Sequence, residues 1–213
     1  MLVLFVEECI VEQRSPEWFA ARLGIPTASM FEAVLAKTKS GYAATRDNYM
    51  SDLICERLTG EREESYINKA MQDGIDREPE ARSALEMLGV TVVEVGFLRH
   101  PTIDTGCSPD GLIEEDGMVE IKCPLKATHK RTLLTGMPSK HIPQVQGQMW
   151  IAGRQWCDFV SYHPLFPDSM RLYVERIKRD NAYISTLESE IVKFLREMQE
   201  DINKLENRYA KCK

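Results

Sequence analysis

The stretch from Cys107 to Pro124, CSPDGLIEEDGMVEIKCP, constrains the fold more than any other, because its pattern predicts a β-hairpin. In its second half, MVEIKC, polar and apolar residues alternate with the period of two that is typical of a strand. Glu120 and Lys122 then share one face, which we expect to point away from the core, while the apolar residues form the other face. A turn at residues 116–117 closes the hairpin onto a short preceding strand.

Asp110 lies in the turn signal Pro-Asp-Gly, at the mouth of that first short strand, residues 112–114. Across the hairpin its carboxylate can approach that of Glu120. Two carboxylates beside the ammonium group of Lys122 suit Mg²⁺, a hard cation that binds oxygen ligands and assists phosphate chemistry. A solvated hairpin with a single Glu–Lys pair is the alternative that these residues leave open.

Glu78 falls on the inward stripe of a helix that the apolar spacing predicts over residues 68–88. Buried carboxylates are rare unless they are paired or bound to metal, so Glu78 is a candidate member of the same site. Pro79 follows it directly. Because a proline inside a helix costs about 3 kcal/mol, we expect the helix to kink or restart there.

A second candidate site is the segment RLGIPTAS, residues 22–29, which joins two predicted helices. Arg22 ends the first helix, and Ser29 lies in the first turn of the second, predicted over residues 28–37 with Thr27 as its N-cap. A guanidinium, a hydroxyl and exposed N–H groups together suit an anion such as phosphate. Simple helix capping beside a surface arginine is the alternative.

The charge of the chain is unevenly distributed. The net charge of −6 argues against a nucleic-acid partner, yet no Asp or Glu occurs from Ile121 to Cys157. That block carries the basic residues Lys122, Lys126, Lys130, Arg131, Lys140 and Arg154. It predicts a local basic surface directly after the proposed metal site.

The cysteines and the apolar segments exclude several classes of protein. No C-x-x-C pair occurs among the six cysteines, which argues against a zinc ribbon or a local iron–sulfur site. Residues 1–13 lack a basic leader and include Glu7 and Glu8, so we expect a first strand there and no signal peptide. Because no apolar run approaches the ~20 residues that span a bilayer, we expect a cytoplasmic protein with free thiols. The cysteines are Cys9, Cys55, Cys107, Cys123, Cys157 and Cys212.

The order of the predicted elements indicates an α/β or α+β fold, in which helices flank a mixed central sheet. We expect a single domain over residues 1–213, with a long amphipathic C-terminal helix, about 180–209, that covers the domain's own core. The other predicted helices are 16–23, 45–58, 127–134 and 142–151, and the other predicted strands are 90–98, 157–162 and 172–177.

Five segments of the chain resemble the phage lambda exonuclease and YqaJ-type viral recombinase family, within the PD-(D/E)xK nuclease superfamily. They occur in the family's order and spacing, from about Ser15 to Lys178, and are RLGIPTAS, NKAMQDGIDREPEAR, CSPDGL, EIKCP and QVQGQMW. An E-x-K triplet alone is weak evidence, whereas the five segments together are specific. Pro26 and Pro79 depart from the family's pattern, and the loop from Lys37 to Ala44 and Arg46, near the expected DNA entrance, cannot be matched.

The resemblance implies a restriction-endonuclease-like core and a Mg²⁺-dependent 5′→3′ exonuclease. Such an enzyme digests one strand of linear double-stranded DNA from 5′-phosphorylated ends to mononucleotides and leaves a 3′ overhang. The resemblance further implies two Mg²⁺ ions, with Mn²⁺ as an alternative, and a ring-shaped homotrimer. It also implies a single-strand annealing protein as partner in recombination, within a bacterial or phage-infected cell.

Residue by residue, Asp110, Glu120 and the main-chain carbonyl of Ile121 match the family's metal ligands. Glu78 matches a helix glutamate near the metals, and Lys122 matches the catalytic lysine.

Gln144 matches the glutamine that helps to place the attacking water, so it joins Asp110, Glu120, Lys122 and Glu78 among the expected catalytic residues. The remaining matches concern the DNA. Arg22 and Ser29 match the pocket for a 5′-terminal phosphate, and the expected DNA contacts are Lys126, Lys130, Arg131 and Lys140.

Two other functions stay open at this point. One is a protein that binds DNA ends without cutting them, against which the complete set of acidic ligands and the lysine weighs. The other is a restriction or repair endonuclease with the same core, which does not explain the phosphate site at Arg22 and Ser29. A zinc hydrolase is disfavoured because the sequence has no His-rich ligand set.

Overall fold

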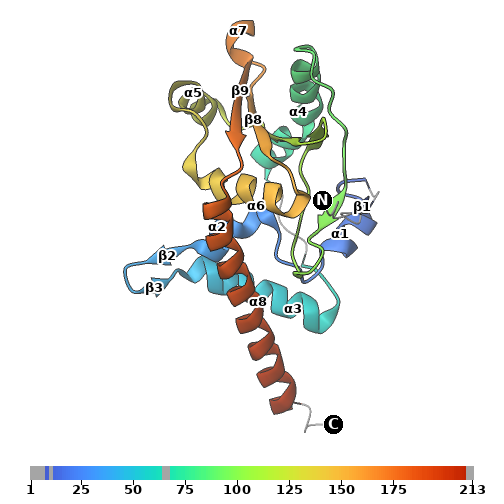
Figure 1. Cartoon of the computed structure of the whole chain (residues 1–213), viewed down its shortest axis with the longest axis vertical. Coiled ribbons are helices and arrows are strands. Elements are labelled where there is room, and N and C mark those ends of the chain that lie inside the picture. Colours follow the sequence, from blue (N-terminus) through green and yellow to red (C-terminus); the bar gives the residue numbers. More distant parts are fainter. Residues whose placement is uncertain (1–7, 10–11, 64–67, 210–213) are drawn as a thin grey trace.

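A four-stranded mixed sheet with helices on both faces forms the upper part of the molecule in Figure 1. The computed structural model describes residues 8–9, 12–63 and 68–209. The parallel pair β7–β8 lies between two antiparallel pairs, β6–β7 and β8–β9. This arrangement confirms the predicted α+β class with a mixed central sheet. The strands in spatial order are β6 (Gly111–Ile113), β7 (Gly117–Lys122), β8 (Trp156–Tyr162) and β9 (Leu172–Lys178).

Both faces of the sheet are covered by helices, α4 (Lys69–Glu86) on one side and α6 (Ile142–Ala152) on the other. Val119 and Ile121 of β7 pack with α4, and Met118 packs with α6. The prediction that one face of this strand points to solvent is therefore wrong. The alternation MVEIKC separates two buried faces and does not separate core from solvent.

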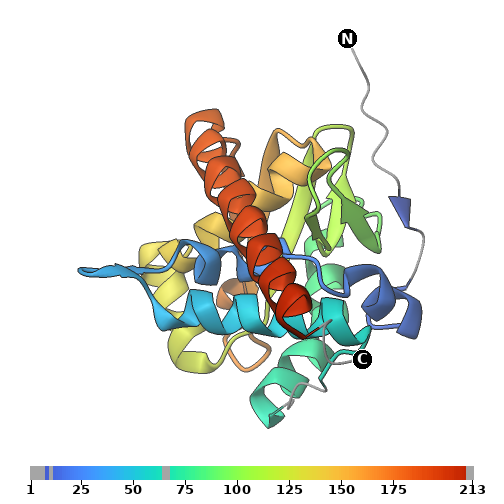
Figure 2. The same cartoon turned by 90° about the horizontal axis from the view of Figure 1, so that it is seen from below.

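A second core lies between helices α2 (Phe31–Leu35), α3 (Ala44–Thr59), α6 and α8 (Asn181–Tyr209). As predicted, α8 buries an apolar stripe against its own chain. Its last turns extend past α3 in Figure 1, and Figure 2 shows this end of α8 in front of α3. Leu205 there is exposed. The buried members of the stripe are Ile184, Leu187, Ile191, Phe194, Met198 and Ile202.

The first helix, α1 (Pro16–Arg22), begins as the sequence predicts. Ser15 Oγ accepts a hydrogen bond from Trp18 N at 3.2 Å, and Gly24, at φ +64°, lets the chain turn away after the helix. The next predicted helix is shorter than expected, because a 3₁₀ turn, η1 (Ala28–Met30), precedes α2, which ends at Leu35. Three other short elements follow the sheet's second strand: α5 (Lys126–Thr135), η2 (Ser139–His141) and α7 (Asp168–Arg171).

The expected loop at residues 37–44 is instead a small hairpin of β2 (Lys37–Thr38) and β3 (Gly41–Tyr42), which projects from the molecule in Figure 1. Its base is held to α8, because Lys37 Nζ and Tyr42 Oη each contact the carboxylate of Glu190, at 2.7 and 2.6 Å. These contacts join segments far apart in sequence, so no local pattern predicts them.

The predicted strand over residues 90–98 is mostly wrong. Only β4 (Phe97–Arg99) forms there, between β1 (Glu8–Cys9) and β5 (Gly106–Cys107), while Val93 makes a single bridge to Leu112. The segment crosses from one sheet to the other, so most of it has no ladder partner. The rest of the predicted first strand, residues 1–7 and 10–11, lies outside the described residues.

Helix α4 runs past Pro79 as one helix, so the expected restart is wrong. Ala81 and Leu85, just after the proline, are buried under the sheet, and this packing offsets the hydrogen bond that Pro79 cannot donate. None of the helices in the described part of the chain is long and apolar enough to cross a membrane. The cysteines that the structure describes, Cys55, Cys107, Cys123 and Cys157, are free thiols.

Candidate active site

The centre of the candidate active site is Glu120, whose side chain is buried in the middle of β7 at 2% exposure. Three donors reach its carboxylate. Lys122 Nζ and Gln144 Nε2 lie 2.5 and 2.6 Å from Oε1, and Gln148 Nε2 lies 2.7 Å from Oε2. Because a buried charge needs such partners, the alternative of a solvated Glu–Lys pair is wrong.

Asp110 lies beside Glu120, held by the backbone of the same hairpin. Its N–H donates to Val119 O at 3.1 Å, and its Oδ2 accepts from Ile121 N at 2.6 Å. Burial raises the pKa of Asp110 well above its ordinary value, and the charges of Glu120 and Glu78 raise it further. The hairpin therefore brings the two carboxylates together, as the spacing predicts.

Lys122 is the positive member of this group. Burial alone lowers the pKa of its ammonium, but the charges of Glu120 and Asp110 outweigh that effect and raise the pKa above its ordinary value. Lys122 is consequently a fixed cation next to the carboxylates. It offsets only part of their charge.

The residues present fit a divalent cation. Asp110 and Glu120 concentrate negative charge, and Gln148 Oε1 is buried without a hydrogen-bond partner among the described residues. No three His, Cys, Asp or Glu side chains in that part of the chain converge as a metal cluster. A site of two carboxylates and the Ile121 carbonyl, completed by water and phosphate oxygens, is the kind of ligand set that Mg²⁺ uses.

Glu78 is partly buried on α4, as expected, but its carboxylate is paired with arginines. Arg14 Nη2 lies 2.7 Å from its Oε2, and Arg82 Nη2 lies 3.6 Å from its Oε1. Arg14 adopts φ +71°, a left-handed conformation that is uncommon outside glycine. Glu78 is near enough to raise the pKa of Asp110, while its role as a metal ligand stays a prediction.

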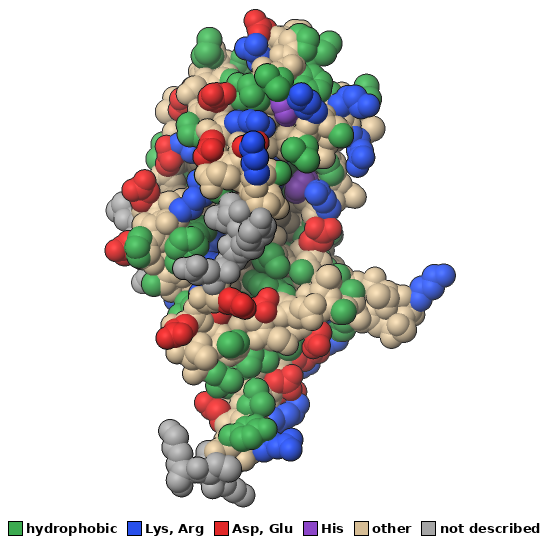
Figure 3. Space-filling model, turned by 180° about the vertical axis from the view of Figure 1, so that it is seen from behind, with side chains coloured by type: hydrophobic (Ala, Val, Ile, Leu, Met, Phe, Trp, Pro, Cys, Tyr) green, Lys and Arg blue, Asp and Glu red, His purple; other side chains and the backbone are tan. Residues whose placement is uncertain are grey.

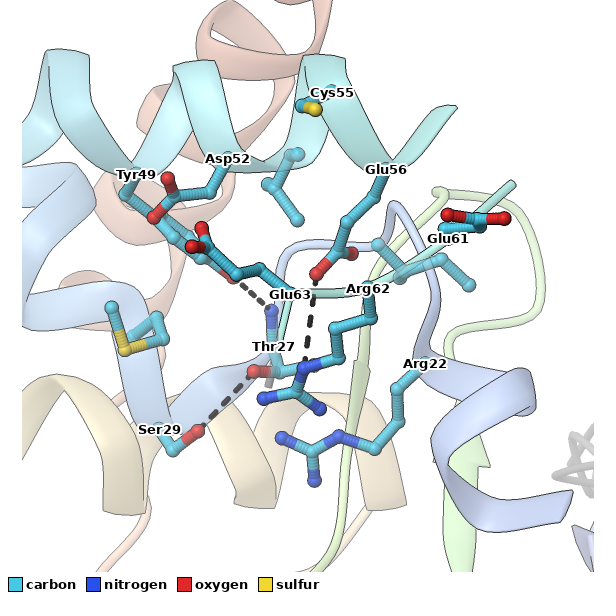
Figure 4. Close-up of a pocket in the computed structure, with 13 residues that line it drawn as sticks. Arg22, Thr27, Ser29, Tyr49, Asp52, Cys55, Glu56, Glu61, Arg62 and Glu63 are labelled. Carbon is cyan, nitrogen blue, oxygen red and sulfur yellow. Dashed lines mark hydrogen bonds and ion pairs between the residues drawn. The ribbon is translucent and has the colours of Figure 1, made fainter. Parts of the chain in front are cut away.

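The predicted phosphate site forms the wall of a cavity of about 460 Å³ between α1, η1 and α3 (Figure 4). The guanidinium of Arg22 stacks 3.9 Å from the ring of Trp18, and its buried Nε has no hydrogen-bond partner among the described residues. Burial lowers the pKa of Arg22 to about 10, helped by the nearby charge of Arg62. Arg22 is therefore no simple surface arginine.

Thr27 and Ser29 line the same cavity, with their hydroxyl oxygens 3.2 Å apart. Thr27 holds the N-cap position of η1, as expected, but its side chain makes no capping hydrogen bond. Its N–H donates to Tyr49 Oη at 3.1 Å, so this amide is already satisfied and is not an exposed donor. The hydroxyls and the guanidinium remain as groups that suit an anion.

Trp18 connects the cavity to the carboxylates. Its Nε1 donates to Ser108 Oγ at 2.9 Å, two residues before Asp110, while its ring stacks against the guanidinium of Arg22. Cys107, buried next to Ser108, has its pKa raised by burial and by Glu120, and lowered by Arg22. Trp18 thus joins the two sites, because it contacts Ser108 of one and Arg22 of the other.

The four expected DNA-contacting residues lie on one side of the site, three on α5 and one in η2. They are Lys126, Lys130, Arg131 and Lys140. All four side chains are exposed, and within the described ranges none has an acidic partner within 4 Å. Figure 3, turned by 180° from Figure 1, shows Lys and Arg side chains gathered on the side where α5 lies. This surface is basic despite the chain's net charge of −6.

Sequence reasoning missed several residues of the two sites. Gln148 follows Gln144 by one helical turn on the same face of α6, and that spacing was a usable signal. Trp18, Ser108 and Arg62 carry no such signal, because they meet only through the packing of distant segments.

Comparisons with known proteins agree with this geometry. The family model of the YqaJ-like viral recombinase domain matches residues 17–155. LHK-Exo, an alkaline exonuclease from Laribacter hongkongensis whose structure is also known in complex with dAMP, is 48% identical. The match covers 93% of this chain and 100% of that chain, with a TM-score of 0.88.

A phage-related exonuclease from Haemophilus somnus 129PT shares the fold, with a TM-score of 0.65, 15% identity, and coverage of 85% of this chain and 96% of that chain. No curated protein matches the chain. The match to the family model spans most of the chain and includes Arg22, Glu78, Asp110, Glu120 and Gln144. The chain belongs to the YqaJ-like viral recombinase family and is a nuclease of the lambda exonuclease type.

Proposed function

We propose that the protein is a Mg²⁺-dependent 5′→3′ exonuclease that acts on linear double-stranded DNA. It digests one strand from a 5′-phosphorylated end to mononucleotides and leaves a 3′ single-stranded overhang. The observation that carries the proposal is the link between the carboxylate hairpin and the arginine cavity through Trp18 and Ser108. A carboxylate centre alone suits many phosphodiesterases, whereas the adjoining cavity gives a terminal phosphate a place to bind.

The cation would be held by Asp110, Glu120 and the main-chain carbonyl of Ile121, where Mg²⁺ supplies Lewis-acid stabilisation of the scissile phosphate. Lys122 brings a permanent positive charge to the same point. Its ammonium offsets charge that develops on the phosphate oxygens and donates to the attacking water. Its 2.5 Å contact with Glu120 fixes its position before substrate binds.

Two glutamines of α6 orient the acidic group. Gln144 and Gln148 donate to different oxygens of Glu120, and Asp110 is fixed by the N–H of Ile121. This preorganisation keeps the reacting groups in place before substrate binds. Gln144 is also proposed to help place the attacking water, in line with the family resemblance.

The duplex is proposed to lie along the basic side formed by α5 and η2, since phosphate contacts by exposed Lys and Arg carry most non-specific DNA affinity. A homotrimeric ring and a single-strand annealing protein as recombination partner are proposed on the family resemblance alone. Two Mg²⁺ ions, or Mn²⁺ in their place, are proposed on the same basis.

The test is digestion of a linear 5′-phosphorylated duplex and of a covalently closed circle, each with Mg²⁺, with the products sized. Release of mononucleotides from the linear duplex, with the circle intact, is the expected result. Cutting of the circle would favour a restriction or repair endonuclease. Tight binding to the ends without any digestion would favour a DNA-end-binding protein.

A further inference from the structure

The cavity beside Arg22 has a basic side and an acidic side (Figure 4). Arg22 comes from α1, and Arg62 comes from the segment that follows α3. The acidic side belongs to α3 and the same following segment, and its members are Asp52, Glu56, Glu61 and Glu63. One side of the cavity therefore attracts an anion, and the other side repels it.

Arg62 has the properties of a second anion-binding arginine. Its charge lowers the pKa of Arg22, so the two guanidinium groups are near enough to repel each other. Figure 4 shows them side by side, next to the hydroxyls of Thr27 and Ser29. An anion between the two cations would replace this repulsion with two attractions.

The donors of Arg62 are available for such an anion. Arg62 Nε forms a long ion pair with Glu56 Oε1, at 3.8 Å, and no described residue forms a hydrogen bond with its guanidinium. Its guanidinium also lies over the ring of Phe19 of α1, at 5.2 Å, which keeps it at the cavity.

Glu56 has a structural task that explains its place in the wall. Its Oε2 accepts from Gly24 N at 2.7 Å, while Arg57 Nε donates to Gly24 O at 2.7 Å. These two bonds tie α3 to the junction between α1 and η1. Asp52 and Glu63 are exposed and make no such bond among the described residues, so their charges face the cavity without a structural reason.

We propose that Arg62 is a specificity-determining residue that binds the terminal phosphate together with Arg22, and that Asp52 and Glu63 limit the pocket to a single phosphate. A 5′-monophosphate fits between the arginines. The further phosphates of a 5′-triphosphate would meet the carboxylates and be repelled. This inference rests on the proposed function, because it assumes that the cavity receives the 5′ end of DNA.

The experiment measures the affinity of the full chain for short fluorescent duplexes by anisotropy, in EDTA so that no cleavage occurs. The duplexes differ only in a 5′-hydroxyl, 5′-monophosphate or 5′-triphosphate end. We expect the unmutated chain to bind the monophosphate end about tenfold more tightly than either other end. Equal affinity for monophosphate and triphosphate ends would overturn the acidic limit, and equal affinity for monophosphate and hydroxyl ends would overturn the whole inference.

Arg62→Gln should remove most of the preference for monophosphate over hydroxyl ends, roughly a tenfold loss. Arg196→Gln is the matched control, because Arg196 is an exposed arginine on α8 that does not line the cavity, and it should change nothing. An Arg62→Gln variant that melts at the unmutated temperature and keeps the full preference would show that Arg62 does not bind the phosphate.

The double variant Asp52→Asn with Glu63→Gln tests the acidic side. We expect its affinity for the triphosphate end to rise towards that for the monophosphate end, and an unchanged affinity would overturn this part. Digestion with Mg²⁺ is assayed separately. A chain that prefers monophosphate ends but digests nothing would contradict the proposed function alone, whereas one that digests DNA but is insensitive to Arg62→Gln would contradict this inference alone.

Discussion

The carboxylate centre and the arginine cavity adjoin each other, yet they are built in opposite ways. Asp110, Glu120 and Lys122 come from one hairpin, in which Glu120 is buried and the other two are half-buried, and together they carry excess negative charge. Arg22 and Arg62 come from separate segments and place two positive charges on one side of a cavity whose other side is acidic. The centre thus suits a cation and the arginine side of the cavity suits an anion, so a phosphorylated DNA end with Mg²⁺ satisfies both.

This contrast predicts that the largest losses of nuclease activity follow from substitutions at the carboxylate centre. Lys122→Ala and Asp110→Ala should each reduce digestion of linear duplex by about 10³-fold or more, because each removes charge stabilisation from the reacting phosphate. Binding to 5′-phosphorylated ends in EDTA should persist, since the cavity is intact. The measurement is mononucleotide release over time, and the control is Lys204→Ala on the exposed side of α8. Robust digestion by either variant would remove the centre from the mechanism.

Arg22→Gln should act on the other region. We expect it to slow digestion of 5′-phosphorylated ends by about 10- to 100-fold, while the rate on 5′-hydroxyl ends stays near that of the unmutated chain. Arg22→Lys should recover only part of the loss, because lysine keeps the charge but lacks the planar group that stacks on Trp18. Initial rates on the two ends, measured side by side, check this. An equal slowing on both kinds of end would place Arg22 in the chemistry and break the division between the regions.

Gln148→Ala should reduce activity by an intermediate amount. It also distinguishes a role of Gln148 in positioning Glu120 from a role in stability alone. It removes the donor to Glu120 Oε2, so we expect roughly a tenfold lower kcat together with a loss of stability of about 1–3 kcal/mol. Gln146→Ala is the matched control on the same helix, because Gln146 is also buried but bonds to Lys178 O and Asp180 N. Gln146→Ala should lower the stability of the fold but leave kcat unchanged. Equal kcat for the two variants would show that Gln148 has only a structural role.

The two regions also differ in how far the sequence predicts them. The hairpin follows from alternation and one turn, and the i, i+4 spacing of Gln144 and Gln148 follows from helix geometry, so local patterns predict most of the centre. What local patterns miss is its burial. The alternation in β7 predicts a wet face for Glu120, but α6 covers that face, and only the tertiary fold places a helix there.

The arginine cavity was predictable only in part. Arg22 and Ser29 lie in one short segment and could be identified, whereas Arg62 joins them only because α3 folds back across α1. The same reason explains why the sequence does not predict the ion pair of Glu78, whose partner Arg14 lies 64 residues earlier in the chain. Charges that meet across such separations leave no periodic signal, so composition and spacing do not reveal them.

The smallest expected effect concerns the basic side formed by α5 and η2. Lys130→Gln on α5 should weaken duplex binding only a few-fold, because each exposed lysine contributes one of several phosphate contacts. It should also reduce the slope of log affinity against log salt by about one, equally for 5′-phosphate and 5′-hydroxyl ends. Anisotropy titrations between low and moderate salt measure this slope, with Lys204→Gln on α8 as control. Because Lys130 has no acidic partner among the described residues, a lost ion pair cannot account for the change. An unchanged slope would place the duplex elsewhere, and a slope that changed for phosphorylated ends alone would make Lys130 part of the end pocket.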